Sequence, residues 1–216
     1  MDFEDASEGL HCLIVQGNVA HLWTQLGQHD QVSQFHSLWV GHLVAETVRK
    51  LSLFNDKHPQ IILGALTHDI GKIKIPKQLL TKNEYLTKEE LWTVRNGHVE
   101  AGWALLSEYP HLQPAAGGHH TVQRIPFAAQ AFSWEKLPQW LTFSVLLIGI
   151  CDMVDRMSRR ILVSDPPKSI DQMRVELQPE HFPMLTGNLE IVDAVLEVVA
   201  EQQSSPLAKG GREEVE

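Results

Sequence analysis

Apolar residues recur every three or four positions along most of the chain, which is the spacing of an amphipathic helix. A first helix is predicted over residues 6–26, where Gly17 is the weakest point and Gly27 is suited to end it. Asp30 is a suitable N-cap for a second helix that reaches about Leu53. The predicted apolar stripe of this second helix consists of Val32, Phe35, Trp39, Val40, Leu43, Val44, Val48 and Leu51.

The helical pattern continues through the rest of the chain. Residues 60–70 are apolar on almost every side, which predicts a buried helix, and a capping box of Thr87 and Glu90 opens the next helix. Residues 137–160 give the strongest helical pattern. No segment alternates apolar and polar residues as a half-buried strand does, so we predict an all-α fold, a helical bundle. The remaining expected helices and helical turns lie at 76–81, 112–116, 169–177 and 189–202.

Breaks in this pattern suggest how the chain is organised. The Ser-Asp-Pro-Pro run at 164–167 interrupts it most clearly, and the polar C-terminal residues lack the apolar content needed for a packed core. We expect an N-terminal helix over 1–29, a principal helical domain over 30–163, a C-terminal helical extension over 164–203 and a disordered tail over 204–216.

Composition narrows the possible partners. The 216 residues carry a formal net charge of −9, which argues against a general electrostatic grip on a nucleic-acid polymer or an anionic membrane. A bound cation would still make a local pocket positive. Cys12 and Cys151 are far apart, the N-terminus is acidic, and the longest apolar run, 140–151, is too short to span a membrane. We expect a soluble cytoplasmic protein.

Several polar residues occupy positions that the helical pattern predicts to be buried. Asp152 interrupts a core-grade helix, and His68-Asp69 ends the buried helix over 60–70. A buried carboxylate is costly unless a cation or strong donors compensate it. Lys72, three residues beyond Asp69, is suited to hold an anionic substrate group as a point charge.

Histidines supply further candidates. His36 lies within the apolar stripe, His98 lies among glycines in a helix, and His119-His120 follow a pair of glycines. Each alone has an ordinary explanation, as a hydrogen-bonded core residue or a surface residue. His42 lies off the stripe and is expected to be solvated.

Taken together, these residues form a set that bundles use for metal sites, with one or two ligands from each of several helices. Asp69 is short enough to bridge two metal ions. The candidate metal ligands are His36, His68, Asp69, His98, His119, His120 and Asp152.

The order of these residues resembles the HD superfamily of metal-dependent phosphohydrolases. The closer resemblance is to its HD-GYP branch, bacterial phosphodiesterases of cyclic dinucleotides such as cyclic di-GMP, and it covers about 34–159. The matching segments are His68-Asp69-Ile70-Gly71-Lys72-Ile73-x-Ile75-Pro76, Leu79-Leu80, Leu86-Thr87-x-Glu89-Glu90, His98-Val99-Glu100-x-Gly102, His36-x-x-x-Val40, His119-His120 and Asp152-x-x-Asp155.

The resemblance implies an HD-type bundle in which the candidate set above binds two divalent metal ions. Iron or manganese is expected first, with zinc, nickel or magnesium as alternatives. Asp69 would be the bridging, catalytic carboxylate, and Lys72 would contact substrate phosphate or orient a ligand. Asp155 would support the site or be structural.

Three departures from the family pattern concern the substrate more than the metals. Val32 stands where some members have a Glu for a third metal, so two metals are expected. The Gly-Tyr-Pro motif and the Glu after the paired histidines are missing. The segment that follows these histidines, 121–136, is expected to be a loop that covers the site. The family's phosphate-binding arginines do not align cleanly with Arg156, Arg159 or Arg160.

The sequence therefore predicts hydrolysis of a phosphodiester in a small anionic nucleotide, most simply a cyclic dinucleotide, by a water activated between two metals. Two alternatives remain: a di-iron oxygenase of the same superfamily, and a non-catalytic module that binds a nucleotide or a partner protein. The first and last helices could pair two copies into a homodimer.

Overall fold

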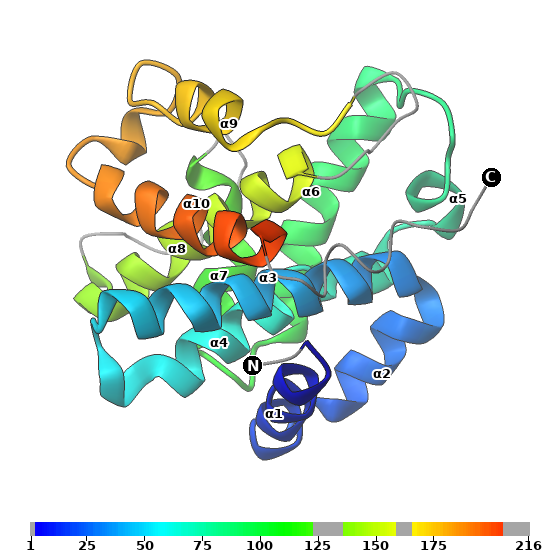
Figure 1. Cartoon of the computed structure of the whole chain (residues 1–216). Helices are drawn as coiled ribbons and strands as arrows, with labels where there is room; N and C mark the ends of the chain where they lie inside the picture. Colours follow the sequence, from blue (N-terminus) through cyan, green and yellow to red (C-terminus); the bar gives the residue numbers. More distant parts are fainter. Residues whose placement is uncertain (1–2, 123–135, 159–165, 205–216) are drawn as a thin grey trace.

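Helices form the regular structure of the computed structural model, which describes residues 3–122, 136–158 and 166–204. No strand occurs among these residues, so the all-α prediction is confirmed (Figure 1). The α-helices are α1 Phe3–Gln16, α2 Ala20–His29, α3 Gln31–Leu51, α4 His58–Thr67, α5 Lys77–Leu80, α6 Lys88–Leu105, α7 Gln113–Gly118, α8 Gln139–Ser158, α9 Ile170–Glu176 and α10 Leu189–Ser204. Short 3-10 helices are η1 Asn55–Lys57, η2 Ile70–Lys74, η3 His119–Val122 and η5 Pro183–Leu185.

The predicted helix starts are confirmed where a side-chain cap marks them. Asp30 accepts a hydrogen bond from the Ser33 amide at 3.2 Å and opens α3. Thr87 and Glu90 form the predicted capping box at the start of α6, each side chain accepting from the other's amide. Such caps satisfy amide groups that the first helical turn leaves without partners, and they depend only on neighbouring residues.

The single N-terminal helix predicted over 6–26 is wrong, because the chain turns between α1 and α2. Asn18 has a left-handed φ of 57°, and an added Cβ on Gly17 would lie 2.3 Å from Leu63 Cδ2. The turn therefore depends on close packing against α4, which no local pattern reveals. Gly27 does not end α2, which continues to His29.

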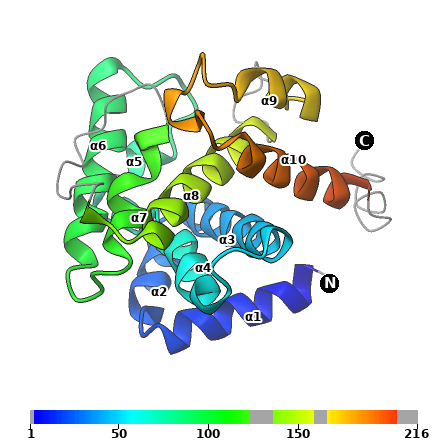
Figure 2. The same cartoon turned by 90° about the vertical axis from the view of Figure 1, so that its left-hand side faces the viewer.

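The core surrounds α4 and α8. Helix α3 packs against α4, α8 and α10, and Figure 2 shows α8 crossing between α7 and α10. The largest fully buried side chains of α8 are Leu147, Ile148 and Ile150. Among the described residues, no helix combines the length and apolar character that a membrane crossing requires.

The predicted stripe of α3 is wrong at its first turn, where Val32 and Phe35 are 75% and 51% exposed. The buried side of this turn instead carries Ser33, His36 and Ser37, so it faces polar groups. His42, expected to be solvated, is buried. Residues of α10 cover His42, since Gln202 Nε2 lies 2.8 Å from its Nε2.

Candidate metal centre

The ends of several helices converge on one buried cluster. Helix α3 supplies His36, the α4–η2 junction supplies His68 and Asp69, α6 supplies His98, the α7–η3 junction supplies His119 and His120, and α8 supplies Asp152. All of these side chains are buried, His36 being the most exposed at 9%. The structure thus brings together every metal ligand expected from the sequence.

Glycines allow the segments that carry these residues to approach closely. An added Cβ on Gly71 would lie 1.8 Å from the His98 carbonyl oxygen, and one on Gly149 would lie 2.3 Å from that of His119. Only a residue without a side chain fits either contact. Gly149 was missed by the sequence reasoning, although a glycine in the middle of a strongly apolar helix is a signal of close packing.

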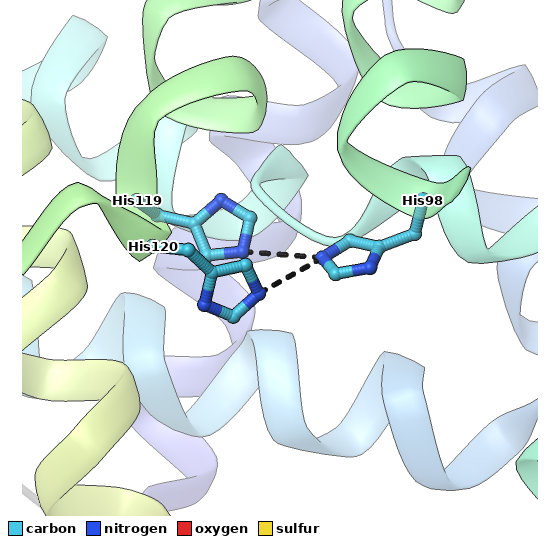
Figure 3. Close-up of side chains that lie close together, drawn as sticks. All are labelled: His98, His119 and His120. Carbon is cyan, nitrogen blue, oxygen red and sulfur yellow. Dashed lines mark hydrogen bonds between the residues drawn. The ribbon is translucent and has the colours of Figure 1, made fainter. Parts of the chain in front are cut away.

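The cluster contains two groups of residues, and within each group the ligand atoms all lie within 4.8 Å of one another. One consists of His36, His68 and Asp69, and the other of His98, His119 and His120. In the second group, His98 Nε2 lies 3.3 Å from His119 Nε2 and 3.2 Å from His120 Nε2 (Figure 3). Each group therefore presents several donor atoms to one point.

Backbone carbonyl groups fix the tautomers of three imidazoles. In each ring Nδ1–H donates to a carbonyl oxygen of the preceding turn, so Nε2 is left with an outward lone pair. These hydrogen bonds join His68 to Ala65 at 2.7 Å, His98 to Val94 at 2.6 Å and His119 to Ala115 at 3.0 Å. The contact between Nε2 of His98 and Nε2 of His119 is consequently lone pair against lone pair.

Burial keeps these imidazoles neutral. It lowers the pKa of His98 to about 3 and is the largest cause that lowers the pKa of His119 to about 4. Burial likewise lowers the pKa of His68 and His120. Neutral imidazole is the form that binds a metal ion.

Asp69, a member of the first group, turns one carboxylate oxygen toward the imidazoles of each group. Its Oδ2 lies 3.6 Å from Nε2 of both His36 and His68, whereas its Oδ1 lies 3.4 Å from His98 Nε2 and 3.9 Å from His119 Nε2. This is the arrangement of a carboxylate that bridges two ligand sets.

Asp152 also reaches both groups. Its Oδ1 lies 3.1 Å from His36 Nε2, and its Oδ2 lies 3.9 Å from His120 Nδ1. Burial would raise the pKa of Asp152, but the charge of Arg156 and the hydrogen bond from His36 hold it well below its usual value. Both Asp152 and Asp69 are therefore ionised inside the protein.

His36 differs from the other imidazoles because carboxylates lie at both of its nitrogens. Its Nδ1 lies 2.6 Å from Asp155 Oδ2, opposite the contact of Nε2 with Asp152. Burial alone would lower the pKa of His36, but the hydrogen bonds to Asp152 and Asp155 outweigh it and raise the pKa to about 9. Asp155 thus orients His36 from the side away from the cluster, as carboxylates do behind metal-binding histidines.

Lys72 compensates the bridging carboxylate. Its Nζ lies 2.5 Å from Asp69 Oδ2. Burial would raise the pKa of Asp69, but the charge of Lys72 holds it well below its usual value. The ammonium group thus occupies one edge of the candidate centre.

The donor set fits divalent metal ions. His68 Nε2 is buried and has no hydrogen-bond partner among the described residues, which is costly unless something binds it. Nitrogen ligands about 2.0–2.1 Å from one ion lie roughly 3.0–3.4 Å apart, which agrees with the separations within the second group. Imidazole and carboxylate ligands suit zinc, iron, nickel and manganese.

Comparison with known proteins agrees with this geometry. The family model described as the HD domain matches residues 35–157, which include every candidate ligand. The chain belongs to the HD domain family. The predicted superfamily is therefore confirmed.

Individual relatives of this HD domain are phosphodiesterases. A cyclic di-GMP phosphodiesterase of Thermotoga maritima is 27% identical over 180 residues, which cover 80% of this chain and 46% of the relative. The chain thus spans about half the length of that curated relative.

Solved structures show the same fold at low sequence identity. The HD domain of the L. monocytogenes phosphodiesterase PgpH in complex with cyclic-di-AMP matches with a TM-score of 0.61 and 15% identity, covering 90% of this chain and 99% of that one. A second structure of that domain gives a TM-score of 0.58 and 16% identity, covering 83% and 97%.

Proposed function

We propose that this HD domain is a metal-dependent phosphodiesterase that hydrolyses a cyclic dinucleotide, with cyclic di-GMP as the first candidate. The observation that carries the proposal is Asp69, whose two oxygens face two separate imidazole groups. The relatives support the substrate class, since one is named for cyclic di-GMP and the other was solved with cyclic-di-AMP.

The proposed metal ligands are those predicted from the sequence. His36, His68 and Asp69 would hold one divalent ion, and His98, His119 and His120 would hold the other. Asp69 would be shared, and Asp152 lies within reach of both groups. Such ions supply Lewis-acid chemistry when bound: they lower the pKa of water and neutralise charge on phosphate oxygens.

The protein's own groups would prepare this chemistry. Carbonyl acceptors fix the neutral tautomers of His68, His98 and His119, so their lone pairs need no rearrangement. Asp155 would fix the ring of His36 and make it a more basic ligand. Lys72, already beside Asp69, would contact the substrate phosphate once the carboxylate has another cation to neutralise it.

The acidic chain is compatible with an anionic substrate. The net charge of −9 is spread over the whole molecule, whereas two divalent ions and Lys72 would make this one site positive. Electrostatic attraction would thus be confined to a small ligand and would not extend to a polymer.

The test replaces the bridging carboxylate by its isosteric amide, Asp69→Asn, with Asp56→Asn as the matched surface control. Purified proteins are analysed for manganese, iron and zinc, and then assayed with cyclic di-GMP, cyclic-di-AMP and linear dinucleotides. We expect the wild type and the control to hydrolyse a cyclic dinucleotide. Asp69→Asn should lose at least about a hundredfold in kcat while remaining folded, since it removes a charged bridging ligand.

Other results would identify the alternatives. Oxygen uptake by an iron-loaded protein without phosphodiester hydrolysis would indicate an oxygenase. A well-folded protein that binds no metal under any loading condition would indicate a non-catalytic module. Full activity in Asp69→Asn would refute the proposed role of the bridge.

A further inference from the structure

A hydrogen bond links helix α2 to the segment that carries Lys72. His29 is the last residue of α2, and its Nε2 lies 2.8 Å from the carbonyl oxygen of Ile75. A carbonyl oxygen can only accept a hydrogen bond, so Nε2 carries the proton and donates it. The two residues are 46 positions apart, so the bond joins α2 to the end of η2, against which this helix packs.

The carbonyl group of Ile75 needs such a donor because the chain leaves η2 at this residue. Ile75 has an extended backbone, with a ψ of 135°, as is favoured before a proline. Its carbonyl group therefore turns away from the 3-10 helix and requires a partner from another element. The imidazole of His29 supplies that partner.

Neighbouring helices thus hold both ends of η2. At its start, Gly71 packs so closely against α6 that an added Cβ would lie 1.8 Å from the His98 carbonyl oxygen. At its end, the side chain of Ile75 is buried, and its Cδ1 would lie 2.9 Å from an added Cβ on Gly97. Ile75 is therefore held by α6 through its side chain and by His29 of α2 through its carbonyl group.

Hydrogen bonds within η2 connect this anchor to Lys72. The Ile75 amide donates to the Lys72 carbonyl oxygen, and the Lys72 amide donates to the Asp69 carbonyl oxygen, both at 3.0 Å. A displacement of Ile75 therefore moves the backbone from which the side chain of Lys72 extends. That side chain is only 16% exposed, and its Nζ contacts Asp69 Oδ2 at the edge of the candidate centre.

We propose that His29 is a positioning residue for Lys72: by fixing the end of η2, it sets where the ammonium group meets the substrate phosphate. The inference rests on the proposed phosphodiesterase function, in which Lys72 contacts phosphate once metal ions neutralise Asp69. A lysine side chain is flexible, so its placement is only as precise as the backbone that carries it. In this role His29 acts through Ile75 and touches neither metal nor substrate.

The experiment compares metal-loaded wild type with His29→Ala and His29→Gln, each also made in a Lys72→Met background. His21→Ala is the matched control, since His21 is an exposed histidine on the same helix. We measure kcat and KM for cyclic di-GMP, with metal content and thermal midpoint alongside. Hydrogen exchange of the Lys72 and Ile75 amides is followed by NMR in the metal-free proteins, which requires no activity.

We expect His29→Ala to raise KM about fivefold or more and to change kcat less than about threefold, because the phosphate contact weakens while the metal ligands stay in place. His29→Gln should restore most of the loss, since its amide can donate from a similar position. In the Lys72→Met background, His29→Ala should change KM less than about twofold, because the group that it positions is missing. His21→Ala should behave as wild type. An equal rise of KM in both backgrounds, no rise in either, or a loss fully explained by lower metal content overturns the inference.

Failure of the proposed function would give a different result. If the metal-loaded wild type hydrolyses no phosphodiester, the exchange rates decide whether His29 anchors η2. Exchange of the Lys72 and Ile75 amides that is about tenfold faster in His29→Ala, but not in His29→Gln or His21→Ala, supports the anchor without the enzymatic activity. Wild-type exchange rates in His29→Ala overturn the inference, whatever the activity.

Discussion

Metal loading should release a proton from His36, and the amount released follows from the structure. With a pKa of about 9, His36 is roughly 99% protonated at pH 7, whereas the pKa values of His98 and His119 are about 3 and 4. To ligate a metal through Nε2, His36 must lose the proton that faces Asp152. We therefore expect His36 to release about one proton per protein on loading at pH 7.

The same proton should weaken metal binding at neutral pH. The pKa lies about two units above pH 7, and each unit corresponds to about 1.4 kcal/mol, so competition costs about 2.7 kcal/mol, or roughly a hundredfold in affinity. Affinity should rise about tenfold per pH unit between pH 6 and 8 and level off near pH 9. Affinity rises with pH because the pKa of His36 is raised: the folded protein holds the proton that must leave more tightly, and this proton competes less as the pH increases.

Asp155→Asn provides a graded perturbation of this proton. The amide can still accept from His36 Nδ1–H, but a hydrogen bond to a charged acceptor is stronger than a neutral one by about 1 kcal/mol or more. The pKa of His36 should then fall by about one unit. At pH 8, wild type should release about 0.9 proton from His36 and the variant about 0.5.

Calorimetric titration with manganese in buffers of different ionisation enthalpy measures the released protons. His36→Gln is the reference variant. A water molecule that ionises in the loaded site would release a proton in both proteins, so subtracting the release of His36→Gln from that of the wild type leaves the contribution of His36. A wild-type release no larger than that of His36→Gln would refute the role of His36 as a protonated ligand. A release of several protons would instead show that the buried imidazoles are charged.

Three further predictions concern stability. Gly71→Ala should unfold the protein or lower its stability by several kcal/mol and abolish metal binding, because its Cβ would lie 1.8 Å from the His98 carbonyl oxygen. The control is Gly9→Ala, whose Cβ would have no atom within 4 Å, so its thermal midpoint should be unchanged or higher. Thr87→Ala should cost about 1 kcal/mol in urea unfolding through loss of the α6 cap, with metal content unchanged, and an unchanged midpoint would contradict the capping role. Removing metal with a chelator should lower the thermal midpoint, and the difference from the loaded sample should grow with the free metal concentration in that sample. Identical midpoints would show that no metal stabilises the folded state.

Local patterns predicted the fold and most of the candidate site. The caps at Asp30 and Thr87 were predictable because a cap involves residues only three positions apart. His36 and Asp152 were recognisable because polar residues in apolar segments need a compensating partner. Their convergence was inferred from the family resemblance, since spacing alone does not tell which helices meet.

Features that depend on distant contacts could not be predicted in the same way. The turn at Asn18 requires Leu63, and the burial of His42 requires Gln202, about 160 residues further along the chain. The predicted loop over the paired histidines and the predicted disordered tail lie almost entirely outside the described residues.

The charges around the cluster explain how this centre can fold before it binds metal. Asp69 has Lys72 at 2.5 Å, and Asp152 and Asp155 share protonated His36. These internal cations compensate carboxylates that would otherwise be too costly to bury. Metal ions would therefore replace a proton on His36 and release Lys72 toward the substrate, rather than create the fold. The same reasoning makes metal affinity depend on pH while the ligand geometry stays fixed by backbone carbonyl groups.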